Sequence, residues 1–167
     1  MMRTNPYQLS REVGFGLLKR GWKIAVAESC TGGGLAYQLT SVPGASQWFD
    51  RGFVTYCGSA KVEQLGVDWD TIQEFGEVSK ETAAAMAQGA LHHSAAHLTL
   101  SITGIAGPTG GVAGKPVGTV WFGLGVRNET VLTCKKLFDS GRKHVRDSSI
   151  SFALLWLLEI LNNKEQR

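Results

Sequence analysis

The chain has 167 residues, of which 43% are apolar and 19% charged, and its formal net charge is +3 at pH 7. This composition predicts a soluble globular protein that folds as one domain over residues 1–167. The weak, scattered positive charge argues against nucleic acid or a membrane surface as partner, and no apolar run approaches the roughly 18 residues that a membrane span needs.

The cysteines and the first residues of the chain indicate a compartment. Cys30, Cys57 and Cys134 are an odd set without the spacing of a disulfide framework or a metal site. The first residues contain no apolar signal segment. We therefore expect a cytoplasmic protein with reduced thiols, no metal and no cofactor.

Apolar residues at helical or alternating spacing, separated by Gly and Pro, predict the elements in chain order. We expect a helix from a cap at Asn5 to Gly21, a strand over 24–27, a helix to about residue 40, a strand over 52–56, a short helix from a Ser59 cap to Gly66, and another from Asp68 or Asp70 to Gly76. A helix over 80–95, a strand over 97–102, a glycine-rich loop to 115–116, strands over 117–126 and 130–138 and a helix over about 141–163 follow. This order predicts an α/β fold, a three-layer α/β/α sandwich with a mixed β-sheet.

The segment 24–36 combines a buried strand, a small polar turn and a helix. Ligands of open α/β folds bind at the carboxyl ends of such strands. One interpretation is that Ser29 or Thr31 only caps the helix. A helix start does not need the consecutive glycines that follow, whereas a ligand close to the backbone does. Thr31, Gly32 and Gly33 are therefore candidate ligand contacts.

Ser29 needs a base before its hydroxyl can act as a nucleophile. Lys61 follows another strand end, and burial that lowered its pKa would let it serve as that base. Tyr56 would relay the proton or hold the amine in place. The alternatives are a solvated Lys61 and a half-buried core Tyr56. Cys30 is a weaker candidate nucleophile, because no histidine lies in a neighbouring cluster to generate its thiolate.

A glycine-rich loop follows the strand that ends near Thr103. It is not a Walker motif, because Thr109 stands where the first glycine must be and Pro116 where the magnesium-binding Ser or Thr must be. Arg142 and Arg146 on the last helix, together with exposed N–H groups of this loop, would suit a phosphate or carboxylate held without metal. Arg142 pointing to solvent is the alternative.

Five motifs in this order resemble the CinA C-terminal domain family over about residues 7–160; they are residues 27–33, 52–56, 60–61 with 65–67, 103–108 with 110–111, and 115–121. The resemblance implies an α/β/α sandwich that is commonly dimeric. It also implies metal-free hydrolysis of the carboxamide of nicotinamide mononucleotide, giving nicotinate mononucleotide and ammonia.

The same resemblance implies roles for individual residues. Ser29 resembles the nucleophile, Lys61 its base and Tyr56 a helper. The loop around the bound nucleotide would consist of Thr103, Gly104, Ala106 and Gly107, with Arg142 at the phosphate.

This sequence departs from the family pattern near the expected site. Cys57 and Gly58 stand where the family usually has Ser-Asn, Ser140 and Gly141 where it usually has Gly-Asp, and Thr109 where Asp is common. A site held 1 Å loosely can lose roughly a hundredfold in rate. A catalytically weak or inactive relative that binds a phosphorylated nucleotide is therefore an alternative function. A protein-interaction module built on the apolar last helix, whose face Trp156 widens, is another.

Overall fold

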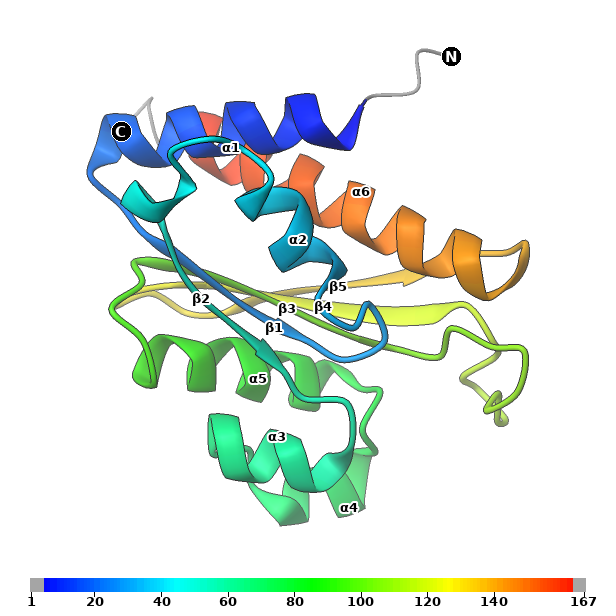
Figure 1. Cartoon of the computed structure of the whole chain (residues 1–167). Coiled ribbons are helices and arrows are strands. Elements are labelled where there is room, and N and C mark those ends of the chain that lie inside the picture. Colours follow the sequence, from blue (N-terminus) through cyan, green and yellow to red (C-terminus); the bar gives the residue numbers. More distant parts are fainter. Residues whose placement is uncertain (1–4, 164–167) are drawn as a thin grey trace.

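The computed structural model describes residues 5–163, which form a five-stranded sheet between two layers of helices (Figure 1). In chain order the elements are α1 Pro6–Arg20, β1 Ile24–Glu28, α2 Gly34–Thr40, η1 Ala45–Gln47, β2 Phe49–Val54, α3 Gly58–Leu65, α4 Trp69–Phe75, α5 Lys80–His92, β3 Leu98–Gly104, β4 Thr119–Val126, β5 Leu132–Leu137 and α6 Gly141–Asn163. The predicted α/β/α sandwich with a mixed sheet is confirmed.

The strand order is β2-β1-β3-β4-β5. β1 runs parallel to both of its neighbours, so that Glu28 pairs with Val54 on one side and with Ile102 on the other. β4 and β5 continue the sheet antiparallel to their neighbours. Three carboxyl strand ends therefore meet at one edge, which is where the sequence places its polar clusters.

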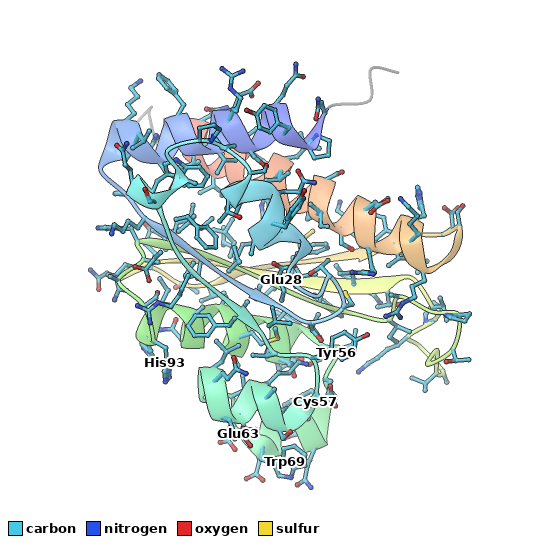
Figure 2. All side chains as sticks on the ribbon, in the orientation of Figure 1. Glu28, Tyr56, Cys57, Glu63, Trp69 and His93 are labelled. Carbon is cyan, nitrogen blue, oxygen red and sulfur yellow. The ribbon has the colours of Figure 1, made fainter. Side chains whose placement is uncertain are left out.

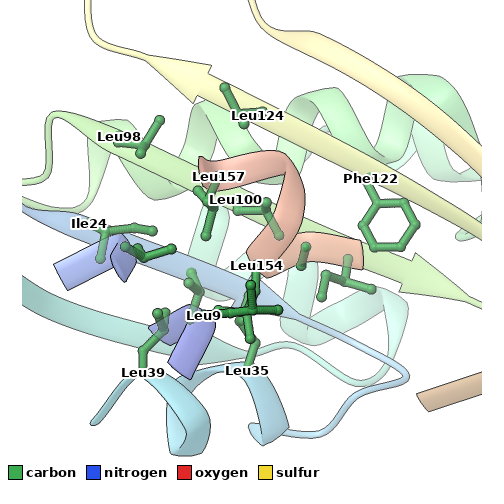
Figure 3. Close-up of a cluster of buried hydrophobic side chains, with 14 of the residues drawn as sticks. Leu9, Ile24, Leu35, Leu39, Leu98, Leu100, Phe122, Leu124, Leu154 and Leu157 are labelled. Carbon is green, nitrogen blue, oxygen red and sulfur yellow. The ribbon is translucent and has the colours of Figure 1, made fainter. Parts of the chain in front are cut away.

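The helices divide between the two faces of the sheet. α1, α2 and α6 cover one face, and α3, α4 and α5 cover the other (Figure 1). The larger apolar cluster lies under the first group and includes Leu35 of α2, Leu100 of β3 and Leu154 of α6 (Figure 3). A smaller cluster on the second face includes Ala27, Leu65 and Met86. Lys61 and its helix α3 belong to this second face.

The structure corrects several predicted boundaries. β2 covers 49–54 rather than 52–56, because its pairing with β1 begins at Phe49 and ends at Val54. α3 begins at Gly58 with Cys57 at the cap position, so Ser59 lies inside the helix and does not cap it. α5 ends at His92 rather than 95, where the Ser94 hydroxyl donates to the Ala90 carbonyl and competes with the helical pattern.

Candidate active site

Glu28, the last residue of β1, fixes the turn that carries Ser29. Its buried carboxylate accepts hydrogen bonds from the N–H groups of Leu35 at 3.0 Å and Ala36 at 2.8 Å. The cap position of α2 is Gly33, which makes no side-chain capping bond. The interpretation of Ser29 or Thr31 as a helix cap is therefore wrong, because Glu28 satisfies the first N–H groups of the helix.

Ser29 and Lys61 meet at the sheet edge. Ser29 is nearly buried, and its N–H donates to the Ile102 carbonyl of β3 at 2.9 Å. Lys61 reaches it from α3 with a fully buried side chain. The Lys61 Nζ lies 3.1 Å from the Ser29 Oγ and donates to the Thr55 carbonyl at 3.0 Å. The two groups are thus within direct proton-transfer distance.

The surroundings of Lys61 act on its pKa in opposite directions. Burial lowers the pKa of the amine below its ordinary value, because the charged form loses its hydration. The Glu77 carboxylate, whose Oε2 lies 3.4 Å from the Nζ, opposes this shift. The net shift is downward, which enlarges the neutral fraction that can accept a proton.

Tyr56 uses its two polar groups in different places. Its backbone carbonyl accepts from the Ser29 hydroxyl at 3.3 Å and from the Lys61 Nζ at 3.5 Å. Its phenol accepts from the Arg142 Nη2 at 2.8 Å, and the side chain is about half exposed. The Tyr56 hydroxyl therefore contacts Arg142 and not the amine that it was expected to assist. Figure 2 labels Tyr56 beside Cys57, where β2 leads into α3.

Arg142 joins the last helix to the glycine-rich loop. Its Nη1 donates to the Gly107 carbonyl at 3.0 Å while its Nη2 holds the Tyr56 hydroxyl. The alternative prediction, that Arg142 only points to solvent, is therefore wrong, because its guanidinium is hydrogen-bonded at both Nη nitrogens. The residue as a whole is still exposed. This places a guanidinium between the ends of β2 and β3.

The end of β3 and the first residues of the loop that follows it are closely packed. A Cβ at Gly104 would lie 2.8 Å from the Val120 Cγ2, and one at Gly107, where φ is +82°, would lie 2.5 Å from the Val117 Cγ1. Ala106 is buried.

Thr103 donates from its Oγ1 to the Glu77 carbonyl at 2.7 Å. These contacts hold the loop beside the Ser29–Lys61 pair and fix the segment that carries Glu77.

A hollow of about 540 Å³ lies between α2 and α6, next to this edge. Its lining consists of Gly34, Tyr37, Gln38, Arg142, Lys143, Arg146, Asp147 and Ile150. Arg146 donates from its Nη2 to the Thr31 carbonyl at 3.3 Å. The same guanidinium nitrogen lies beside Gly32, where an added Cβ would be 3.6 Å from it. The buried Thr31 Oγ1 and Arg146 Nε find no hydrogen-bond partner within residues 5–163.

The alternative nucleophile Cys30 is disfavoured by its surroundings. Burial raises the pKa of its thiol to about 11, so the reactive thiolate is scarce near neutral pH.

Sequence reasoning missed the roles of two carboxylates. Glu28 lies within the first motif, and its capping role depends on a turn that brings residues 35 and 36 back to it. Glu77 lies in the connection between α4 and α5, and no local pattern marks it. Only the tertiary fold brings it to Lys61.

Residues 5–163 contain neither a metal-binding cluster nor a membrane-spanning helix. His, Cys, Asp and Glu side chains do not gather there in threes that could hold a metal ion. None of the helices in that range has the length and apolar character needed to cross a membrane.

Comparisons with known proteins agree with the fold. A model of the CinA C-terminal domain matches residues 6–161. The nicotinamide-nucleotide amidohydrolase PncC of Enterobacter agglomerans is 48% identical over 154 residues, which cover 92% of this chain and 94% of that protein. The protein of the same name from Escherichia coli K12 is 44% identical over 151 residues, or 89% and 92% of the two chains.

Solved structures are similarly close. The competence/damage inducible protein CihA from Agrobacterium tumefaciens has a TM-score of 0.91 at 42% identity, covering 97% of this chain and 98% of that one. The competence damage-inducible protein A from Klebsiella pneumoniae has a TM-score of 0.92 at 34% identity, covering 95% and 98%.

Proposed function

The chain belongs to the CinA C-terminal domain family, and from that premise we propose that it is an amidohydrolase that converts nicotinamide mononucleotide to nicotinate mononucleotide and ammonia. Relatives that match nearly the whole chain at 44–48% identity are named for the hydrolysis of a nicotinamide nucleotide. The observation that carries the proposal is the 3.1 Å contact between the Ser29 Oγ and the Nζ of a fully buried lysine. Burying a lysine costs free energy of folding, whereas a buried neutral amine beside a serine hydroxyl can activate that hydroxyl as a nucleophile.

In the first half of the proposed reaction, the neutral Lys61 amine takes the proton of the Ser29 hydroxyl as the oxygen attacks the carboxamide carbon. The tetrahedral intermediate then collapses, Lys61 returns the proton to the leaving nitrogen, and ammonia departs. We expect backbone N–H groups of the turn after Ser29, which Glu28 holds in place, to stabilise the oxyanion.

In the second half, a water molecule replaces ammonia at the Ser29 ester. Lys61 takes a proton from this water as the water oxygen attacks the ester carbon. It then returns the proton to the Ser29 Oγ as the ester bond breaks, so that the serine is restored and nicotinate mononucleotide is released. The same amine thus acts as base and then as acid in each half, which is the logic of a Ser-Lys hydrolase. Tyr56 contributes its carbonyl to this pair.

The phosphate of the nucleotide would bind on the α6 side of the edge. Arg142 supplies a guanidinium held by the Gly107 carbonyl and the Tyr56 hydroxyl. Arg146 adds a second guanidinium beside Thr31. We expect Thr31, Gly32 and Gly33 on one side, and the loop from Thr103 to Gly107 on the other, to enclose the rest of the substrate.

The test is ammonia release from nicotinamide mononucleotide by the purified chain, followed together with the formation of nicotinate mononucleotide. We expect the two products in equal amounts, and far slower release from nicotinamide, which lacks both the ribose and the phosphate. Saturable binding without ammonia would instead identify an inactive binder of phosphorylated nucleotides. Release from nicotinamide as fast as from the nucleotide would contradict the proposed phosphate site.

A further inference from the structure

Glu77 supplies the carboxylate that faces the proposed base. It lies in the connection between α4 and α5, and its Oε2 is 3.4 Å from the Lys61 Nζ. The Glu77 side chain is 46% exposed, whereas that of Lys61 is 0% exposed. The carboxylate therefore reaches from the surface to a buried amine.

The absence of a side chain at residue 58 leaves room for this contact. A Cβ added at Gly58 would lie 3.3 Å from the Glu77 Oε1 and 3.2 Å from the Trp69 Cζ3, both tighter than ordinary contacts. The backbone of Glu77 is also fixed, because its carbonyl oxygen accepts a hydrogen bond from the Thr103 Oγ1 at 2.7 Å. The position of Glu77 thus depends on the space left at Gly58 and on the hydrogen bond from Thr103 of β3.

We propose that Glu77, which packs against Gly58, is a positioning residue for Lys61. Its carboxylate stabilises the ammonium that forms when the Lys61 amine takes the Ser29 proton. Glu77 thereby sets the pH range of the reaction. This proposal rests on the proposed function. The Glu77 carboxylate takes no proton itself: the proton moves from the Ser29 Oγ to the Lys61 Nζ, and the negative charge of Glu77 lowers the energy of the resulting cation.

Among the described residues, Glu77 is the group whose charge acts most strongly on Lys61. Burial lowers the Lys61 pKa, and Glu77 raises it through charge and a hydrogen bond. Cys57 acts in the same direction as Glu77, and its own thiol pKa is lowered by hydrogen bonds from Ser59 and the backbone of Ala60. Cys30 would act likewise only as a thiolate, and it is neutral near pH 7 because burial raises its pKa to about 11.

The first test compares the pH dependence of kcat/KM for the wild type and Glu77→Gln. Removing the charge lowers the Lys61 pKa further, so the acidic limb of the profile should move to lower pH. Because Glu77 is half exposed, we expect a shift of about 0.5 to 1 pH unit. Glu63→Gln is the matched control, since it removes the same charge from an exposed position on α3 (Figure 2), and its limb should not move. An unmoved limb in Glu77→Gln would overturn the proposal.

The second test uses Gly58→Ala, which crowds the carboxylate without removing it. We expect the limb to move in the same direction by a smaller amount. In the Glu77→Gln background the added methyl group should then have almost no further effect. Equal shifts in both backgrounds would show that residue 58 acts independently of Glu77.

A titration of Lys61 separates this proposal from the proposed function. The ¹³Cε signal of Lys61, assigned with Lys61→Met, reports the amine's pKa without any substrate. A lower Lys61 pKa in Glu77→Gln than in the wild type supports the electrostatic role even if the chain releases no ammonia. An unchanged Lys61 pKa refutes that role even if the chain is an active amidohydrolase.

Discussion

Lys61 is the residue whose environment is hardest to explain by stability. A charged amine without exposure costs several kcal/mol in lost hydration unless it is well paired. Its Nζ lies near four acceptors, the Ser29 hydroxyl, the carbonyls of Thr55 and Tyr56, and the Glu77 carboxylate. This set accommodates both the neutral and the protonated amine, which is what a group that takes and returns a proton requires.

Lys61→Met tests that role, because the substitution keeps most of the volume and removes the amine. We expect the rate of ammonia release to fall at least 100-fold, since a general base typically contributes about 10²–10⁴. In the wild type, kcat/KM should fall as the pH drops through the lowered pKa of Lys61, because the ammonium cannot accept the Ser29 proton. The exposed Lys80→Met serves as the control. A Lys61→Met protein that is folded and fully active would contradict the assignment.

For single residues, the sequence predicted part of the candidate site. Ser29 and Lys61 follow strand ends in an α/β pattern, so they could be paired without coordinates. The contact made by the Tyr56 hydroxyl could not, because it depends on β2 ending at Val54, two residues before the predicted end. Glu77 could not be identified either, since its contact with Lys61 depends on how the α4–α5 connection folds back over Gly58.

At the scale of elements, the contact between α3 and α5 determines where Lys61 lies. Gly89 of α5 packs directly on the end of α3, where an added Cβ would lie 2.0 Å from the Leu65 carbonyl oxygen. Backbone atoms cannot yield as a flexible side chain does. The glycine therefore allows α3 to approach closely enough for Lys61 to reach the sheet edge.

Gly89→Ala should push α3 away from α5. We expect a loss of about 1–3 kcal/mol in the free energy of unfolding, which is typical of overpacking. A displacement of 1 Å at Lys61 would lower the rate roughly 100-fold. Urea unfolding and ammonia release measure the two effects. Gly16→Ala is the control, because its Cβ would meet the flexible Leu161 side chain at 3.3 Å on the other face of the sheet. Wild-type stability and rate in Gly89→Ala would refute this account of the contact.

The spacing of apolar residues predicted the existence of the helices and strands better than it predicted where they end. The apolar spacing of the last helix predicted its span well, since the observed α6 is Gly141–Asn163. α3 begins at Gly58 rather than after a Ser59 cap. α5 ends earlier than predicted, where the Ser94 hydroxyl donates to the Ala90 carbonyl, a local bond that competes with the helical pattern.

For the whole molecule, the alternation of helices and strands was enough to predict three layers, but not the order of the strands. The order β2-β1-β3 brings the three polar strand ends to one edge. The outer surface formed by α1 and α6 remains partly apolar, with Phe15 71%, Leu18 46% and Leu155 47% exposed. Trp156, interpreted from sequence as a core or interface residue, packs against Phe152 with ring centroids 5.9 Å apart.

The dimer expected from the family resemblance can be tested on this surface. We expect sedimentation equilibrium to give about twice the chain mass of 18.0 kDa for the wild type. Phe15→Glu places a charge on the apolar surface and should give the mass of one chain, with an unchanged circular dichroism spectrum. The exposed Arg11→Glu is the control for charge alone on α1. A wild-type monomer, or a Phe15→Glu dimer, would contradict this expectation.

We expect Ser29 to carry the acyl group during hydrolysis, and the mass of the protein quenched in acid during turnover of nicotinamide mononucleotide tests this directly. The expected result is an adduct equal to the substrate minus ammonia on the peptide that contains Ser29, with neither adduct nor ammonia release in Ser29→Ala. Cys30→Ala should retain both. Ammonia release by Ser29→Ala at the wild-type rate, or an adduct on Cys30, would contradict it.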